Sequence, residues 1–172
     1  VSGKMAAAIT RGVQSVPGVG TTIKHFACNN QEDNRMKVSS NVGERALREI
    51  YLRGFEICVR EGHAKGMMTA YNRINKVYAP NNYDLCTKVL RNEWGFDGVV
   101  MTDWFSTGGG KMRNSLAMKA GNDLIMPGLG GNKKDIIKGV KSGLIAEEDV
   151  RRCCGNVVKA ILNSATQREY IG

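Results

Sequence analysis

An aspartate that follows a short apolar run is the residue with the clearest chemical potential in this chain. The run spans residues 99–101, an Asp-Gly turn at 97–98 precedes it, and Asp103 and Trp104 follow it. Carboxylates are seldom buried without a partner, so an aspartate at the mouth of a sheet is a candidate nucleophile, metal ligand or general base. The structural alternative is an aspartate that caps the following loop. We favour a chemical role because other polar groups occupy equivalent positions.

Three further candidates stand at or near the ends of similar apolar runs. Lys24 and His25 form a dyad that could donate hydrogen bonds to sugar hydroxyls or to an anion. Tyr71 could donate its hydroxyl hydrogen to a neighbouring carboxylate and favour the ionised form of that carboxylate. Met68 would lie near the same edge, although a methionine in a strand belongs more often to the core.

The elements that must position these residues alternate between short strands and longer helices. We expect strands at residues 21–26, 67–71, 99–102 and 124–126, and helices at 3–13, 44–62, 85–94, 111–119, 134–140 and 147–164. Asn41 and Glu44 resemble a capping box for the second helix, and Gly95 is expected to end the third. Strands that are each followed by a helix predict an α/β fold of parallel β/α units, whose strand carboxyl ends share one edge.

Four β/α units admit two architectures. They can close into a small doubly wound sheet, or they can form about half of a TIM-type (β/α)8 barrel, which typically takes about 250 residues. The pattern of strands and helices does not decide between these two.

The composition is that of an ordinary globular chain, with 172 residues, 42% hydrophobic content and 24% charged content. No apolar run approaches the roughly 20 residues that a membrane span requires, so we expect no membrane partner. The chain starts at Val1 with what reads as the interior of a helix, and we therefore expect residues 1–172 to be one partial domain of a longer polypeptide.

The net charge of +9 raises the possibility of nucleic-acid binding. Lysines and arginines are spread over most of the chain and aromatic residues are few, so we expect no nucleic-acid partner. Two glycine-rich segments, residues 107–111 and 128–133, precede predicted helices and could bind phosphate through backbone amides. Neither matches the phosphate-loop pattern, and we interpret both as turns. A non-catalytic basic α/β module that binds anions or nucleic acid through these segments remains the alternative.

The cysteines do not indicate a metal or disulfide framework. There are five, an odd number, and no two are spaced as Cys-x-x-Cys. No group of histidine, cysteine and carboxylate residues has metal-ligand spacing, so we expect no metal and no cofactor. Unpaired cysteines fit a reducing compartment, and the expected location is the cytoplasm.

The ordered series of motifs resembles the catalytic barrel domain of glycoside hydrolase family 3, the β-glucosidase and β-xylosidase group. The series consists of KHFACNNQE at 24–32, ERALREIYL at 44–52, MTAYN at 68–72, GFDGVVMTDW at 95–104 and AGNDLIMPG at 120–128. The resemblance implies that the chain is the C-terminal half of that barrel. The segment at 27–29 after the dyad differs from the Pro-Gly type of the β-N-acetylglucosaminidase branch, which favours the glucosidase and xylosidase branch.

The resemblance also implies roles for individual residues. Asp103 matches the nucleophile of a retaining β-glycosidase, and Lys24 and His25 match the dyad that binds the hydroxyls of the sugar. Trp104 matches the aromatic residue beside the nucleophile, and Tyr71 the phenol that supports it. Met68 is expected to line the wall of the pocket. The substrate class implied is a β-linked glucoside or a related β-glycoside.

Two departures from the family pattern limit what this chain can do alone. The earlier β/α units of the barrel are absent from the 172 residues, and so is the separate α/β domain that supplies the acid/base glutamate in this branch. We therefore expect the chain by itself to be inactive. A half-barrel would also leave strand edges and an apolar face uncovered, and we expect it to self-associate.

Overall fold

The computed structural model of the protein describes residues 1–107 and 113–167. Its main sheet contains the three strands β1 (Thr22–Phe26), β3 (Gly66–Thr69) and β6 (Val99–Met101), all parallel, in the order β1-β3-β6. This confirms the predicted α/β fold of parallel units. The fourth predicted strand, residues 124–126, is reduced to a single parallel bridge between Met101 and Leu124.

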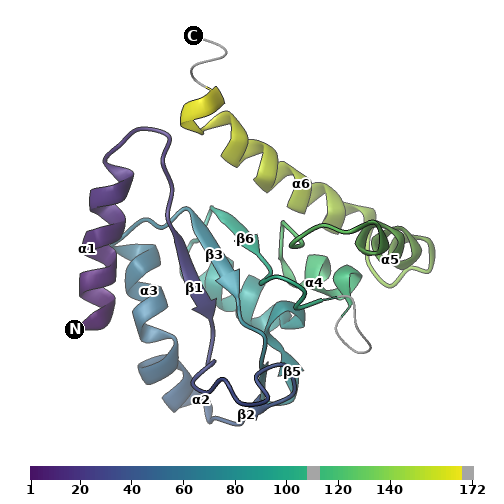
Figure 1. Cartoon of the computed structure of the whole chain (residues 1–172), viewed down its shortest axis with the longest axis horizontal. Helices are drawn as coiled ribbons and strands as arrows, with labels where there is room; N and C mark the ends of the chain where they lie inside the picture. The colour runs from purple at the N-terminus through teal and green to yellow at the C-terminus, as the bar shows by residue number, and fades with distance from the viewer. Residues whose placement is uncertain (108–112, 168–172) are drawn as a thin grey trace.

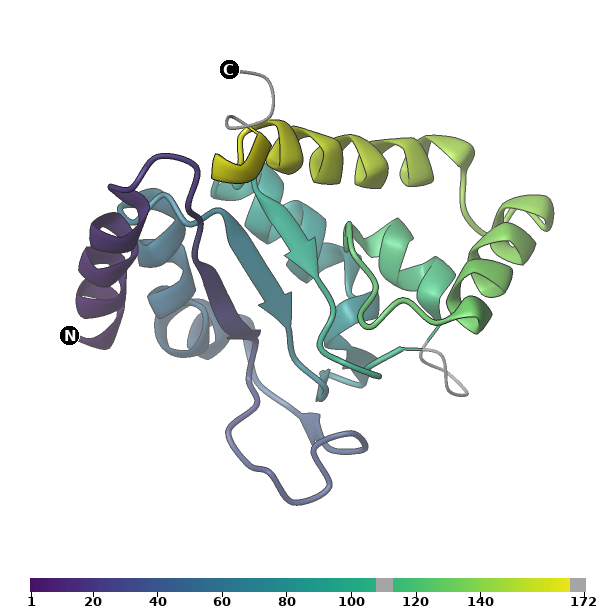
Figure 2. The same cartoon turned by 45° about the horizontal axis from the view of Figure 1, so that its top comes forward.

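Helices connect the strands and flank the sheet, as Figures 1 and 2 show. Three of the α-helices are long, and two of the other helical segments have wider, π-helical turns. The helical elements are α1 (Ser2–Gln14), α2 (Glu44–Ala46), η1 (Leu47–Tyr51), α3 (Arg53–Arg60), η2 (Ala79–Asn81), η3 (Asp84–Glu93), α4 (Asn114–Ala120), α5 (Gly130–Lys141) and α6 (Glu147–Leu162). None of these helices combines the length and the apolar character needed to cross a membrane.

The main core lies between one face of the sheet and the helices α3 and η3. Phe26, Met67 and Val100 point from the three strands into this core and are completely buried. Phe26 packs its ring edge-on against Phe55 of α3, with ring centroids 5.1 Å apart. Each fully buried side chain of this size contributes about 1.5–3 kcal/mol to stability, so this layer holds the strands in register.

The opposite face of the sheet is more open. Neighbouring residues of a strand point to opposite faces, so Met68 and Met101 lie across from the core that buries Met67 and Val100. Both methionines are only partly buried, and Lys24 of β1 is exposed. Figure 2 shows the sheet with helices behind it and no described helix over its front. The expected uncovered face is therefore present, and Met68 lies on it.

A second small sheet was not predicted. It contains β2 (Ser39–Ser40), β4 (Arg73–Ile74) and β5 (Val77–Tyr78), with β2 parallel to β4 and β4 antiparallel to β5. Residues 75–76 join β4 to β5 with φ angles of 48° and 74°, as the tightest hairpin turns require. Two-residue strands are too short to show alternation, which is why the sequence pattern missed them.

Several expected helix ends differ from the structure. Asn41 does not cap the second helix, because α2 begins after Gly43 and receives no side-chain cap. Gly95, with φ of 74°, follows the end of η3 as predicted. The start of the helix expected at 111–119 and most of the glycine-rich segment 107–111 lie outside the described residues. The other glycine-rich segment is not only a turn, since Gly130 and the following residues form the first turn of α5.

Candidate active site

Asp103 lies just beyond the carboxyl end of β6 and is 9% exposed. Its Oδ1 accepts a hydrogen bond from the Trp104 N–H at 2.7 Å, and its backbone carbonyl accepts one from the Ser106 hydroxyl at 2.9 Å. Its Oδ2 lies 3.2 Å from Nε2 of His25. The backbone of the turn therefore fixes one carboxylate oxygen, while the other oxygen faces His25 of β1, across β3.

The two residues of the dyad have different surroundings, and they lie where the register of β1 against β3 shifts. His25 brings its ring to Asp103 with its side chain 32% exposed. Lys24 is exposed, and no ion pair joins it to a carboxylate within the described parts of the chain. The structure thus brings His25 together with Asp103 and leaves the Lys24 ammonium available to another group.

Tyr71 follows β3 and reaches the same turn. Its hydroxyl donates to the backbone carbonyl of Trp104 at 2.6 Å and also lies beside the Asp103 carboxylate, the partner that the sequence suggested. Burial and the nearby Asp103 carboxylate together raise the pKa of Tyr71, and Arg35 opposes them only in part. The phenol therefore remains a hydrogen-bond donor at neutral pH and holds the Asp103-Trp104 turn against β3.

Trp104 and Met68 complete the predicted set. The Trp104 side chain is on the surface, 51% exposed, and its ring meets that of Phe105 edge-on with centroids 6.1 Å apart. Met68 is half-buried on the open face of the sheet, next to Met101 in register. Trp104 is therefore exposed, and Met68 lies on the face of the sheet that no described helix covers.

Arg35 is a site residue that the sequence reasoning missed. Its guanidinium lies 4.4 Å from the centre of the Tyr71 ring and pairs with Glu32 at 2.7 Å. A cation over an aromatic face is stabilised by the ring quadrupole, so Arg35 helps to fix the phenol that binds the Asp103 turn. The segment of residues 29–37 has no periodic pattern, and nothing in it signals that the chain folds back over β3.

Asn72 fastens the loop after β1 to the end of β3. It is completely buried, and its Nδ2 donates to the carbonyls of Ala27 at 3.1 Å and Cys28 at 3.2 Å. Cys28 has a left-handed φ of 64°, so its carbonyl is turned toward this donor. Asn72 therefore has a structural role, and it keeps the end of the His25 strand beside the Tyr71 strand.

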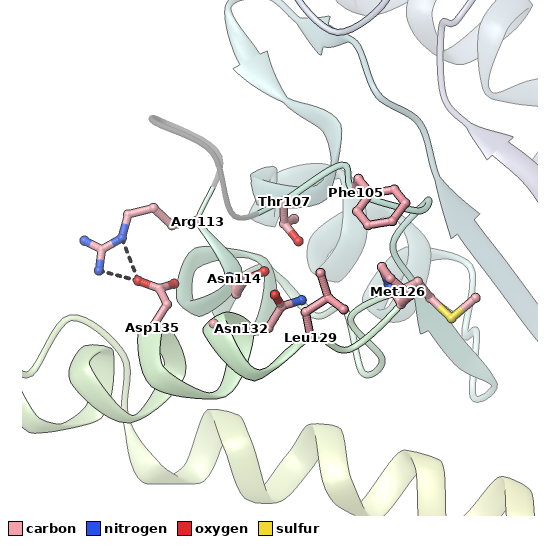
Figure 3. Close-up of a pocket in the computed structure, with 10 residues that line it drawn as sticks. Phe105, Thr107, Arg113, Asn114, Met126, Leu129, Asn132 and Asp135 are labelled. Atoms are coloured by element: carbon pink, nitrogen blue, oxygen red, sulfur yellow. Dashed lines mark hydrogen bonds and ion pairs between the residues drawn. The ribbon is translucent and has the colours of Figure 1, made fainter.

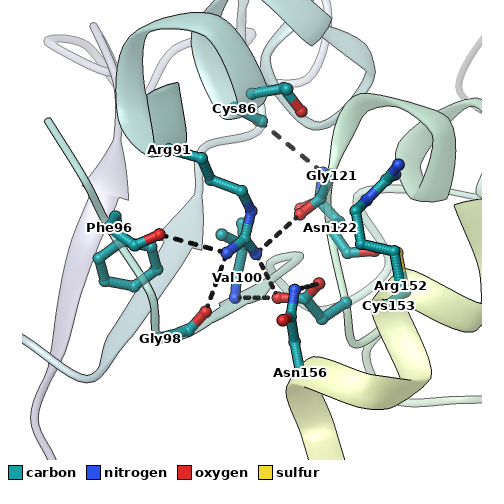
Figure 4. A network of polar contacts seen from close by, with 12 residues as sticks. Cys86, Arg91, Phe96, Gly98, Val100, Gly121, Asn122, Arg152, Cys153 and Asn156 are labelled. Carbon is teal, nitrogen blue, oxygen red and sulfur yellow. Dashed lines mark hydrogen bonds and ion pairs between the residues drawn. The ribbon is translucent and has the colours of Figure 1, made fainter. Parts of the chain in front are cut away.

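A buried ion pair between Arg91 and Asp123 holds β6 at Val100, and Figure 4 shows the network around it. Asp123 accepts hydrogen bonds from the guanidinium of Arg91 at 2.5 Å and from the Val100 N–H at 2.8 Å through Oδ2. Its Oδ1 accepts from Asn156 of α6 at 2.9 Å. This network joins η3, β6 and α6, and it fixes the strand that positions Asp103.

The chemistry open to this arrangement is that of a single oriented carboxylate. Within residues 1–107 and 113–167, no three histidine, cysteine or carboxylate side chains are grouped to hold a metal ion. Glu32 is exposed and accepts hydrogen bonds from Asn29 and Arg35, so it is engaged away from Asp103. The site can supply a nucleophile or a base, with donors and an aromatic ring around it.

The comparisons with known proteins place the chain in a family. The description "Glycosyl hydrolase family 3 N terminal domain" matches residues 1–160. A β-glucosidase of Ruminococcus albus is 38% identical over the whole chain, which covers 19% of that protein. An exo-α-(1->6)-L-arabinopyranosidase of Bifidobacterium longum is 41% identical over 94% of the chain and is covered to 20%.

A solved structure extends the match to three dimensions. β-Glucosidase 3B from Thermotoga neapolitana, in complex with α-D-glucose, superposes with a TM-score of 0.89 and 45% identity over 98% of this chain, which covers 24% of that protein. The chain thus spans about a fifth to a quarter of the length of the relatives it matches. The parallel units are part of a barrel domain, which confirms the second of the two architectures. The chain belongs to glycoside hydrolase family 3.

Proposed function

We propose that the protein carrying this chain hydrolyses terminal β-D-glucosides, or related β-glycosides, with retention, and that Asp103 is the nucleophile. The observation that carries the proposal is the orientation of Asp103, with Oδ1 held by the Trp104 N–H and Oδ2 facing His25. Relatives named as β-glucosidases support the substrate class. One relative is named as an exo-α-(1->6)-L-arabinopyranosidase, so the proposal includes glycosides related to β-D-glucosides.

The proposed reaction has two steps. Oδ2 of Asp103 attacks the anomeric carbon, the glycosidic bond breaks, and the leaving oxygen takes a proton from a second carboxyl group. Water, deprotonated by that same group, then hydrolyses the glycosyl ester and regenerates the carboxylate. Substrate must displace His25 from Oδ2, and the imidazole and the exposed Lys24 then donate to sugar hydroxyls.

Three other residues surround the attacking carboxylate in this proposal. Trp104 offers an exposed ring against which a sugar can stack. Met68 forms part of the wall on the open face of the sheet. Tyr71 acts by positioning, since its hydroxyl binds the carbonyl of Trp104 and keeps the turn in place.

The acid/base group has to come from another part of the protein. Retention requires a second carboxyl about 5 to 5.5 Å from the nucleophile, and Glu32 is engaged with Arg35. We therefore propose that further β/α units and a separate α/β domain complete the site, and that the isolated chain is inactive. The open face of the sheet and the edge strand β1 are the surfaces through which the isolated chain would self-associate, and Met5 and Ile9 of α1, 60% and 65% exposed, add to its apolar surface.

Covalent trapping tests the proposal. The protein carrying this chain is treated with an activated 2-fluoro-β-glucoside, digested, and mapped by mass spectrometry. We expect one glycosyl group on the peptide that contains Asp103, and none in Asp103→Asn. A label on another peptide would overturn the assignment of the nucleophile. Hydrolysis of simple β-glucosides without any label would overturn the retaining mechanism.

A further inference from the structure

A pocket of about 480 Å³ opens beside the loop that follows Trp104, as Figure 3 shows. The loop residues Phe105 and Thr107 form one side of it, and Asn114, at the start of α4, lies at the base. Leu129 and Asn132, at the start of α5, close the other side. None of these side chains takes part in the hydrolysis proposed above, so the pocket needs an explanation of its own.

The amino-terminal end of α5 faces this pocket without a cap. Leu129 precedes the helix, no side chain caps it, and the first turn of the helix contains no acidic residue. No atom of the described residues lies within 4 Å of the position that a Cβ would take at Gly130 or Gly131, so a ligand can approach their backbone closely. Free N–H groups and the helix dipole at such an end favour a negatively charged group.

Two buried polar side chains in the pocket have no partner of their own. Thr107 is 8% exposed and Asn114 is 2% exposed. Within the described parts of the chain, neither the Thr107 Oγ1 nor the Asn114 Oδ1 takes part in a hydrogen bond. In Figure 3 the Thr107 hydroxyl points toward the space between Leu129 and Asn132. Buried polar atoms are nearly always paired, so these two mark the place of a polar ligand.

The charges around the pocket favour an anion over a cation. The one carboxylate of its lining, Asp135, is bound by the guanidinium of Arg113 at 2.8 Å and by the Ser115 N–H at 2.9 Å. Burial works to raise the pKa of Asp135, but these donors outweigh it and hold the pKa below its usual value. The carboxylate is therefore neutralised, while Lys133 and Lys134 in the first turn of α5 are exposed.

We propose that this pocket binds a phosphate group, as the free ion or as a monoester. The Thr107 hydroxyl and the N–H groups of Gly130 and Gly131 donate to the phosphate oxygens, and the Asn114 amide does so with its NH₂ turned inward. Phe105, Met126 and Leu129 form the apolar side against which the organic part of a monoester packs.

Isothermal titration calorimetry with inorganic phosphate and with phenyl phosphate tests the proposal on the protein that carries this chain. Thr107→Val removes the unpaired hydroxyl, and Asn132→Asp places a negative charge in the first turn of α5. Each variant is expected to weaken phosphate binding about tenfold or more, Thr107→Val by the loss of roughly one hydrogen bond to a charged group and Asn132→Asp by repulsion between like charges. Thr166→Val, an exposed threonine beyond the end of α6, is the matched control and is expected to bind normally.

Neither variant should fail to fold. Thr107→Val removes a buried polar atom that has no partner, and an aspartate at position 132 is favoured by the helix dipole, so melting temperatures should stay level or rise. Tighter binding of phenyl phosphate than of inorganic phosphate would identify a monoester, and equal binding would identify the free ion. Binding of neither at millimolar concentration, or binding that both variants leave unchanged, would overturn the site.

Discussion

Two aspartates near β6 show how the same side chain serves two purposes. The side chain of Asp123 is completely inaccessible, and both of its carboxylate oxygens accept hydrogen bonds, from Arg91, Val100 and Asn156. Asp103 keeps 13% of its side chain exposed, and its neighbours are the Trp104 N–H, His25 and the Tyr71 hydroxyl. A carboxylate whose acceptor positions are filled holds segments together, whereas one with a position left open can engage a ligand.

The difference follows from where each aspartate stands on the sheet. Asp103 lies beyond the carboxyl end of β6, where barrel folds place their reactive groups. Asp123 binds the N–H of Val100 within the strand and joins it to η3 and α6, on the side where barrels are stabilised. Substitutions at the two positions should therefore affect different measurements.

The largest expected effect is on activity at Asp103. In the protein that carries this chain, Asp103→Asn keeps the size of the side chain but removes the charge of the proposed nucleophile. We expect kcat for a β-glucoside to fall by more than about a thousandfold, the scale of losing a nucleophile. The melting temperature should change little, because an amide oxygen at this position can still accept the hydrogen bond from the Trp104 N–H.

The matched comparison is Asp123→Asn measured in the same two assays. It should lower stability more than Asp103→Asn and lower kcat less. If Asp123→Asn reduced kcat as strongly while the protein stayed folded, the division between a reactive and a structural aspartate would be wrong.

The next effect is on stability, and it concerns the ion pair itself. Asp123→Ala leaves the Arg91 guanidinium, 12% exposed, without its charged partner. Breaking a buried pair in this way costs about 3–5 kcal/mol, measured by urea unfolding. The double variant Arg91→Met with Asp123→Leu should be less destabilised than Asp123→Ala, because no charge is left buried. A double variant that is worse would mean that the hydrogen bonds to the backbone, rather than the charge, carry the stability.

The sequence predicted the position of Asp103 at the end of its strand, but it did not predict most of the contacts that support this position. Residues 99–103 showed an apolar run ending in a carboxylate, and a local pattern of this kind predicts both the strand and the position of Asp103 at its end. The same reasoning placed His25 and Tyr71 at the same edge, where the structure brings them to the Asp103 turn.

The supporting contacts depend on long-range pairing that no local pattern encodes. Arg35 reaches Tyr71 from a loop without periodicity, and Asn72 bonds to carbonyls 44 and 45 residues away in the chain. The partner of Asp123 could not be named either, since Arg91 is one of many arginines on helices. Sequence patterns report which face of an element is buried, while the pairing of polar groups across elements is decided by the packed fold.

The smallest expected effect is on the reactivity of thiols near the two aspartates. It tests whether the two sites differ only in their access to water. Cys28, on the Asp103 side, and Cys153, which donates to the Asn122 carbonyl beside Asp123, are both buried. Burial raises the pKa of Cys28 to about 11 and that of Cys153 to about 12. Cys154 is exposed, so a disulfide reagent should label the peptide of Cys154 rapidly and those of Cys28 and Cys153 slowly, and the rapid label on this peptide should be lost in Cys154→Ser.

Cys28 and Cys153 should also make the stability of the protein depend on pH. Their pKa values are raised in the folded state above the ordinary 9.0, so the folded protein holds protons that the unfolded chain releases. Stability should therefore be complete below about pH 9 and fall as the pH rises through 11 and 12, a decline visible in urea unfolding at about pH 8 and about pH 10. If Cys28 instead reacted as fast as Cys154, the strand end beside Asp103 would be open to solvent. Water access, rather than the number of donors, would then explain why Asp103 and Asp123 differ.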